Sequence, residues 1–272
     1  MKKVIVITGA SSGMGKNFAL DLLKKGHIVY GLARRVEKMD DIVKAGGKAI
    51  AMDITQETQV ENAVNQILHE QGKVDVLINN AGYALYGPVE ESTIDSARRQ
   101  FEVNMFGLAS ITQKVIPIMR KYKSGRVINI SSMGGKMYTP FGAWYHATKH
   151  ALEGWSDCLR LELESFGIDV VIIEPGGIET EFTNVFLENL QGDANNGPYA
   201  DSLQKIIKST GEMAEKGQLS SPSVITNLID KAVHSKRPKT RYVAGSFAKP
   251  LMFMRKYLGD RRFDKILMRQ LQ

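Results

Sequence analysis

The stretch VINISSMGGKMYTPFGAWYHATKHALEG, from Val127 to Gly154, shows the pattern on which the whole chain is built. It begins with a short apolar run that ends in Ser131 and Ser132, as a buried strand does when polar side chains follow at its carboxyl end. A loop rich in glycine and aromatic residues comes next, and a helical pattern starts near Trp144. The stretch therefore predicts a strand, a loop and a helix, the repeating unit of an α/β fold.

The same alternation extends outward in both directions along the chain. Strands separated by helices imply right-handed crossovers and a mainly parallel sheet that is covered on both faces. We therefore predict a doubly wound α/β fold with a helical extension at the carboxyl end. Strands are predicted at 3–8, 27–32, 48–52, 74–79, 126–131, 169–174 and 241–244. Helices are predicted from about 15 to 25 and at 36–45, 57–70, 92–122, 144–166, 221–234 and 248–271, the last with a bend at Gly259.

Length and composition favour a single soluble domain. A chain of 272 residues fits one α/β domain, which we divide into a core for cofactor and catalysis (1–180), a substrate lid with the last strand (181–247) and an amphipathic extension (248–272). The apolar run Val4–Ile7 directly follows Met1–Lys3, so we expect no signal peptide ahead of it. The single cysteine, Cys158, excludes an internal disulfide and favours a cytoplasmic location. Its helical surroundings predict a buried side chain.

The net charge of +7 is concentrated in the carboxyl-terminal tail. Residues 246–272 hold seven Lys or Arg against two Asp, which leaves the rest of the chain close to balanced. A basic tail is not a basic face, so we expect no nucleic-acid partner. The tail itself has three interpretations: it packs over a substrate entrance, it rests on an anionic membrane surface as basic amphipathic helices do, or it is a subunit contact or solvated end.

Tyr145 and Lys149 stand four residues apart at the start of the helix predicted at 144–166, so they share one face. The ordinary pKa of tyrosine is about 10, and we expect the ammonium group of Lys149 to lower the pKa of Tyr145. Ser132, at the strand edge, is placed to hydrogen-bond a carbonyl oxygen while Tyr145 protonates it. The alternative is that Tyr145 packs against the sheet and Lys149 is solvated. A dinucleotide site elsewhere in the chain would favour the catalytic interpretation.

The segment from Thr8 to Gly15 has the composition of such a site. It joins a predicted strand to a predicted helix, where glycines permit a tight turn and let backbone N–H groups approach a pyrophosphate. Its Gly-x-x-x-Gly-x-Gly spacing differs from the Gly-x-Gly-x-x-Gly fingerprint, and glycine-rich turns also occur for structural reasons alone. The candidate cofactor ligands in this loop are Gly9, Ser11, Ser12, Gly13, Met14 and Gly15.

The residues that end the second predicted strand, Ala33-Arg34-Arg35, indicate which dinucleotide is bound. A carboxylate at this point hydrogen-bonds the ribose of NAD, whereas arginine accommodates the additional phosphate of NADP. This chain has two arginines and no carboxylate there. We therefore predict NADP(H) in preference to NAD(H), with Arg34 the main ligand and Arg35 in support; the alternative is a solvated surface pair.

Taken together, the motifs resemble those of the short-chain dehydrogenases/reductases, in the single-domain branch. The matching residues are Thr8-Gly-x-x-x-Gly-x-Gly15, Asn79-Asn80-Ala81-Gly82, Asn104, Ser132, Tyr145-x-x-x-Lys149 and Pro175-Gly176-x-x-x-Thr180. They occur in the expected order over residues 3–180, and within the family the chain looks most like the 17β-hydroxysteroid and retinol dehydrogenase group. The resemblance implies a seven-stranded Rossmann sheet and hydride transfer between nicotinamide and a carbonyl or alcohol carbon.

The resemblance also implies a role for each matching residue. Tyr145 is the general acid/base, Lys149 also binds the nicotinamide ribose, and Asn104 holds a water of the proton relay. No metal is expected. The cofactor contacts implied further along the chain are Asp53 and Ile54 to the adenine, Asn80, Ala81 and Gly82 beside its ribose, and Pro175, Gly176, Ile178 and Thr180 around the nicotinamide. Asn104 satisfying backbone groups and Thr180 capping a helix are the structural alternatives.

The substrate pocket is expected between the loop after Ser132, the segment after Thr180 and the tail. Its candidate lining residues are Ser132, Met133, Tyr138, Tyr145, Phe182 and Phe186. Methionine and aromatic side chains suit an apolar pocket, although they also fill cores. We predict a lipophilic ketone, aldehyde or secondary alcohol as substrate.

Two other functions share these motifs. A 3-oxoacyl-thioester reductase of fatty-acid synthesis has the same catalytic set, but the tail after Val243 argues against it because such enzymes are usually shorter. A non-catalytic NADPH sensor can use the same fold, yet has little reason to keep Ser132, Tyr145 and Lys149. The family also implies a homodimer or homotetramer, with the helix at 144–166 as a contact.

Overall fold

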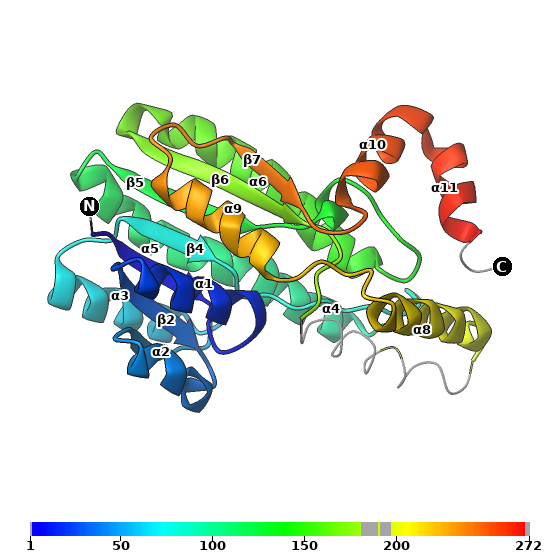
Figure 1. Cartoon of the computed structure of the whole chain (residues 1–272), viewed down its shortest axis with the longest axis horizontal. Coiled ribbons are helices and arrows are strands. Elements are labelled where there is room, and N and C mark those ends of the chain that lie inside the picture. Colours follow the sequence, from blue (N-terminus) through cyan, green and yellow to red (C-terminus); the bar gives the residue numbers. More distant parts are fainter. Residues whose placement is uncertain (1, 181–189, 191–196, 270–272) are drawn as a thin grey trace.

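The sheet is the frame of the molecule (Figure 1). The computed structural model describes residues 2–180, 190 and 197–269. Its strands are β1 (Val4–Thr8), β2 (Ile28–Ala33), β3 (Lys48–Ala51), β4 (Val76–Asn79), β5 (Gly125–Ile130), β6 (Ile168–Pro175) and β7 (Arg241–Ala244). They pair in the order β3-β2-β1-β4-β5-β6-β7, each pair parallel. The doubly wound fold is confirmed, and the strand order reverses between β1 and β4, where such sheets bind ligands at their carboxyl ends.

Each face of the sheet carries its own hydrophobic core, because alternate strand residues point to opposite sides. Ile5 and Ile7 pack with α1 (Gly13–Lys24), α2 (Asp40–Lys44) and α9 (Ser223–His234). On the other face, the core side chains of β1 are Val4 and Val6. They pack with α3 (Glu57–Gln71), α5 (Leu108–Lys121) and α6 (Ala143–Leu163). The helices therefore sandwich the sheet, and their amino ends face the carboxyl edge of the strands.

The region predicted as helix at 92–122 is built from three parts. α4 (Ile94–Phe101) is followed by a π-helical turn, η2 (Glu102–Gly107), and then by α5. π turns insert an extra residue and occur frequently at functional sites. Short 3-10 turns are η1 (Val36–Met39), η3 (Met133–Gly135) and η4 (Glu164–Phe166).

Within the described residues beyond β6, α8 (Ala200–Glu215) is a helix that the sequence did not predict. It lies in the region that was assigned to a lid, and its Leu203 is buried against Leu190. Most of 181–196 lies outside the described residues, and so do the substrate candidates Phe182 and Phe186.

The carboxyl-terminal extension consists of α10 (Ala248–Leu258) and α11 (Asp260–Met268), which project from one end of the sheet in Figure 1. The predicted bend at Gly259 is confirmed, with φ at 73°. Phe263 and Leu267 are buried against Met137, and Tyr138 donates a 2.8 Å hydrogen bond to Asp264. The extension is thus anchored on the loop that follows Ser132.

One side chain differs from its prediction. Cys158 was expected in the core, but it lies exposed on α6 because it falls on the solvent side of that helix. Within the described residues, we find no helix that is both long and apolar enough to span a bilayer.

Candidate active site

Ser132 and Tyr145 meet at the carboxyl edge of β5. Ser132 caps the η3 turn, its Oγ accepting a 3.0 Å hydrogen bond from the backbone N–H of Gly134. Tyr145 comes from the first turn of α6, where its side chain is buried and hydrogen-bonded to that of Ser132. Two residues that are thirteen positions apart are therefore brought together by the strand–loop–helix unit, as expected.

Lys149 lies one turn beyond Tyr145 on the same buried face of α6. Its Nζ is 5.9 Å from the centre of the Tyr145 ring and donates a 2.9 Å hydrogen bond to the carbonyl oxygen of Ile130. Burial lowers the pKa of Lys149 to about 8, and the negative charge of Glu153 acts in the opposite direction. The shared face predicted for Tyr145 and Lys149 is confirmed.

The pKa of Tyr145 differs from its prediction. We expected Lys149 to lower it, but burial raises the pKa of Tyr145 to about 12, and the hydrogen bond with Ser132 only partly offsets this. The physical reason is that burial disfavours the charged phenolate, while the Nζ of Lys149 hydrogen-bonds the Ile130 carbonyl oxygen and stays 5.9 Å from the centre of the tyrosine ring. Tyr145 is therefore a protonated phenol at neutral pH, which suits a proton donor.

His146 holds the loop between Ser132 and α6, a role that motif matching missed. Its Nδ1 is 2.9 Å from the Gly134 carbonyl oxygen, and its Nε2 accepts a 3.0 Å hydrogen bond from the backbone N–H of Thr139. These partners require a neutral ring with the proton on Nδ1, and burial lowers the pKa of His146 accordingly. The only sequence signal was its position beside Tyr145.

Asn104 lies in the π turn and fastens the segment after β4. Its Nδ2 donates to the Tyr83 carbonyl at 2.9 Å and to Thr148 Oγ1 at 3.1 Å, while its Oδ1 accepts from the Tyr83 N–H at 3.1 Å. Asn104 thus satisfies backbone groups, which is the alternative given above to holding a water of the proton relay. It also joins this segment to the helix that carries Tyr145 and Lys149.

The glycine loop forms a cradle that fits a dinucleotide. Gly9 has φ at 67°, and a Cβ there would lie 2.8 Å from the Cα of Ala81. A Cβ on Gly15 would lie 2.5 Å from Asn80 Nδ2, whose amide donates to the carbonyl oxygens of Thr8 and Gly9 at 3.1 and 3.2 Å. Only glycine fits these positions, so the backbone itself forms the surface that a pyrophosphate approaches.

Beside this loop is a cavity of about 350 Å³ at the amino end of α1. Of the predicted ligands, Ser11, Ser12 and Gly13 line it, together with Lys16, Glu37, Lys38, Asp40, Asp41 and Lys44. Met14 lies in the first turn of α1 and packs against the core of that face. An anion here would meet free backbone N–H groups and the positive end of the helix dipole.

The ends of β2 and β3 lie close enough to interact. Arg34 and Arg35 are exposed after β2, and Asp53 follows β3. Burial acts against the charged form of Asp53, but hydrogen bonds from Thr55 and the charge of Arg34 hold its pKa below the ordinary value. The two predicted adenosine-side ligands, Arg34 and Asp53, therefore border one region. Ile54 is buried against Gly107.

The segment after β6 returns to the glycine loop. The N–H of Gly176 donates to the Ala244 carbonyl at 2.8 Å, and Ile178 is buried. Thr180 Cβ would lie 4.0 Å from a Cβ on Gly13. The structure thus brings the predicted nicotinamide-side segment, from Pro175 onward, against the predicted phosphate loop.

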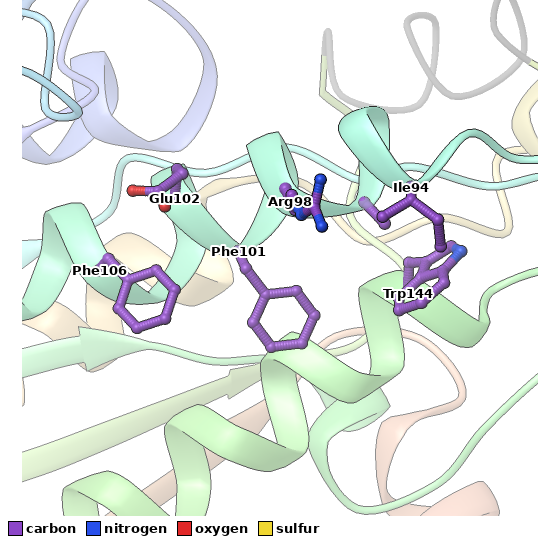
Figure 2. A pocket seen from close by; sticks show the side chains of 7 residues that line it. Ile94, Arg98, Phe101, Glu102, Phe106 and Trp144 are labelled. Atoms are coloured by element: carbon purple, nitrogen blue, oxygen red, sulfur yellow. The ribbon is translucent and has the colours of Figure 1, made fainter.

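The predicted substrate pocket stays a prediction, because Phe182 and Phe186 lie outside the described residues. Met133 and Tyr138 are partly buried and pack against α10 and α11. The apolar groove in Figure 2 is a different feature, of about 220 Å³, formed by α4, η2 and the first turn of α6. It is lined by Ile94, Ala97, Arg98, Phe101, Glu102, Phe106 and Trp144. Since neither Ser132 nor Tyr145 lines it, we do not assign it to the reaction site.

The fold and this site together define an oxidoreductase of the short-chain dehydrogenase family, and the chain belongs to that family. The sequence model of the short chain dehydrogenases matches residues 3–191. The chain is 39% identical over 250 residues to the 3-ketodihydrosphingosine reductase of Bacteroides thetaiotaomicron, covering 92% of this chain and 90% of that one. It is 35% identical to the NADPH-dependent 3-dehydrocapnine reductase of Ornithobacterium rhinotracheale, covering 98% and 96%.

Among solved structures, a short-chain dehydrogenase from Streptomyces avermitilis superposes with a TM-score of 0.81 at 32% identity, covering 100% of this chain and 98% of the other. The seven-stranded sheet implied by the family resemblance is confirmed. The likeness to the 17β-hydroxysteroid and retinol dehydrogenase group stays a prediction.

Proposed function

We propose that the protein is an NADP(H)-dependent reductase of a hydrophobic ketone. The observation that carries this proposal is the convergence of Ser132, Tyr145 and Lys149 at the sheet edge, next to a glycine cradle that fits a dinucleotide. NADPH, when bound, supplies the hydride. Cellular NADPH normally drives reduction, and the protonated state of Tyr145 suits the same direction.

In this proposal each side chain acts on a stated atom. Ser132 Oγ hydrogen-bonds the carbonyl oxygen of the substrate and orients it, and the Tyr145 hydroxyl donates the proton to that oxygen. Lys149 binds the ribose hydroxyls next to the nicotinamide, and Asn104 holds a water that returns the proton to Tyr145. The remaining cofactor contacts keep the roles implied by the family for Asp53, Ile54, Asn80, Ala81, Gly82, Pro175, Gly176, Ile178 and Thr180.

The preference for NADP(H) is supported by the charge at the end of β2. Arg34 and Arg35 follow Ala33 without an intervening carboxylate, and both are exposed. An arginine there pairs with the 2′-phosphate of NADP. The relative from Ornithobacterium is itself described as NADPH-dependent.

The substrate class is supported by two relatives whose names both describe a group at carbon 3, 3-keto in one and 3-dehydro in the other. We propose a ketone on a long apolar chain, with 3-ketodihydrosphingosine the first compound to test. A 3-oxoacyl thioester is the alternative substrate, and a non-catalytic NADPH sensor is the alternative of another class.

Nicotinamide fluorescence on titration with NADPH and NADH, followed by turnover of a carbonyl panel, tests this function. Tight NADPH binding with reduction of an apolar 3-ketone is the expected result. Preference for NADH would contradict the role of Arg34. Reduction of an acyl-carrier-protein substrate instead would favour the fatty-acid alternative, and binding without turnover of any carbonyl would favour the sensor.

We also propose that the chain works as one cytoplasmic domain in a homodimer or homotetramer. The groove of Figure 2 supports the assembly, because Phe106 is exposed there next to Phe101. Leu161 is exposed further along α6 and supports it as well. A second copy would cover these apolar side chains. Light scattering of the wild type and of a Phe106→Lys variant tests it, with a smaller particle expected for the variant.

The extension is proposed to touch a membrane surface with its outer side. Phe253 and Tyr257 are 62% and 61% exposed, one turn apart on α10, with ring centres at 4.6 Å. Lys249 and Lys256 are exposed on the same side of α10. Aromatic side chains flanked by lysines fit the interface of an anionic bilayer, where a lipophilic substrate would be found.

A further inference from the structure

Two buried glutamates lie beside the candidate catalytic residues and have no part in the roles described above. Glu153 is one turn after Lys149 on α6, and Glu174 precedes Pro175 at the end of β6. Their exposed fractions are 3% and 1%. Carboxyl groups are rarely so deeply buried unless their oxygens are paired. The oxygens of Glu153 and Glu174 are therefore expected to have cations or hydrogen-bond donors as partners.

Cations from two other segments reach the pair. Lys136, just after η3, places its Nζ 3.0 Å from Glu153 Oε2. Arg241 of β7 donates from Nε to the same oxygen at 3.1 Å, and from Nη2 to Asp157 Oδ2 at 2.6 Å. Arg160 also pairs with Asp157. Two cationic side chains, those of Lys136 and Arg241, thus contact the Oε2 atom of Glu153.

Glu174 is paired far less well. The nearest cation to it is Arg241, whose Nε lies 3.5 Å from Glu174 Oε1. That oxygen and Glu153 Oε1 are buried, and neither receives a hydrogen bond from the part of the chain that the structure describes. Burial and repulsion from Glu153 raise the pKa of Glu174 to about 7. A protonated carboxyl group becomes a donor, so one proton on Glu174 would satisfy both unpaired oxygens.

The charge that remains on Glu153 acts on Lys149. Burial favours the neutral amine of Lys149, and Glu153 is the neighbour whose charge opposes this effect. The two residues are four positions apart on α6, so they lie on one side of the helix. Glu153 therefore helps Lys149 to keep its proton at neutral pH.

We propose that Glu153 and Glu174 share a single proton, carried by Glu174, and that the negative charge left on Glu153 keeps Lys149 in its ammonium form. Glu153 is then a positioning residue that acts through Lys149. The second part of the proposal rests on the function proposed above, because it matters only where Lys149 serves cofactor binding and proton transfer.

The shared proton is tested without substrate, by infrared spectroscopy of the full-length protein as a function of pH. The wild type should show the band of a buried protonated carboxyl group, which disappears as the pH rises through about 7. Glu174→Gln should lack this band, and Asp157→Asn, which changes another partner of the same arginine, should retain it. A band that persists in Glu174→Gln would overturn the shared proton.

The effect of the Glu153 charge on the ionisation of Lys149 is tested by the pH profile of kcat/KM for carbonyl reduction with NADPH. In Glu153→Gln the alkaline limb should move to lower pH by about one unit, the usual effect of losing a close opposite charge. Glu174→Gln and Asp157→Asn should leave the limb in place, and Glu153→Asp should restore it. A lower kcat in Glu153→Gln with an unmoved limb would overturn the positioning role.

The two tests separate the proposals. If the wild type reduces no carbonyl compound yet shows the titrating band, the proposed function fails while the proton-sharing pair stands. If Glu153→Gln does not fold, the band in Glu174→Gln still decides whether the proton is shared. Glu153→Met, which also removes the negative charge, then replaces Glu153→Gln in the pH profile with the same expected shift of the alkaline limb.

Discussion

A single oxygen atom on Tyr145 carries the chemistry proposed for this site. Tyr145→Phe removes it and retains the ring, which packs 5.7 Å from the ring of Tyr86. We expect turnover to fall by about 10²–10⁴-fold, the usual contribution of a positioned acid, with the melting temperature and NADPH affinity nearly unchanged. Steady-state rates, calorimetry and coenzyme titration provide the measurements. Turnover close to that of the wild type would remove Tyr145 from the mechanism.

At the same scale, Arg34 is predicted to select the coenzyme. Arg34→Asp should weaken NADPH binding by about tenfold or more, because a charge-assisted hydrogen bond contributes roughly 1.5–3 kcal/mol, and it should leave NADH binding little changed. Lys121→Asp makes the same change of charge on the exposed end of α5 and serves as the control. Equal losses for both coenzymes in Arg34→Asp would place the phosphate elsewhere.

Single residues also show where sequence reasoning stops. Ser132, Tyr145 and Lys149 could be selected from the sequence, because their spacing and the strand–helix pattern bring them to one edge. The hydrogen bond from Lys149 to Ile130 and the pairing of Glu153 with Glu174 could not, because both depend on the packing of distant segments.

Between elements, a histidine pair joins the start of β2 to the end of α9. His27 Nδ1 accepts from the Lys3 N–H at 3.2 Å, so its Nε2 carries the proton and donates to His234 Nε2 at 2.8 Å. His234 Nδ1 in turn lies 2.9 Å from an Asp230 carboxylate oxygen. An added proton on His27 would break this chain of hydrogen bonds, and burial together with the neighbouring charges lowers its pKa.

This pair predicts a pH dependence of stability. Because the pKa of His27 is lower in the folded protein than the unfolded value of about 6.5, the unfolded chain binds more protons, and this contribution to stability is lost as pH falls below that value. His27→Gln should therefore destabilise the protein more at pH 7.5 than at pH 5.5. Urea unfolding of both proteins at the two pH values measures the difference, and an unchanged difference would contradict the prediction.

The elements themselves were predictable to different degrees. Strands buried on both faces are continuous apolar runs, so their positions agree with prediction to within one or two residues. The π turn at η2 was not predictable, because one extra residue is hidden within a helical pattern of ordinary composition. α8 was missed because its surroundings are rich in glycine and asparagine.

For the whole molecule, the exposed side of α10 predicts salt-dependent binding to anionic lipid. A Phe253→Ser/Tyr257→Ser variant should bind vesicles of phosphatidylglycerol and phosphatidylcholine at least about tenfold more weakly than the wild type, since burying each aromatic ring contributes roughly 1.5–3 kcal/mol. Val43→Ser, at an exposed apolar residue of α2, is the control. Vesicle co-sedimentation at low and high salt measures binding, and equal binding of all three proteins would exclude this surface.

At this scale the topology followed from the sequence, because consecutive parallel strands need right-handed crossovers. The position at which the extension packs could not be predicted from the sequence. The contact of Phe263 and Leu267 with Met137 joins segments more than a hundred residues apart.

The π turn also limits how this chain can change its length. The extra residue of the turn is absorbed within Glu102–Gly107, so α5 presents the same side to the sheet as it would after an uninterrupted helix. Each further residue inserted or deleted would turn α5 by about 100° around its axis, and Ile111, Val115 and Met119, now buried against the sheet, would turn toward water. The segment is therefore expected to tolerate the loss of one residue but not of two.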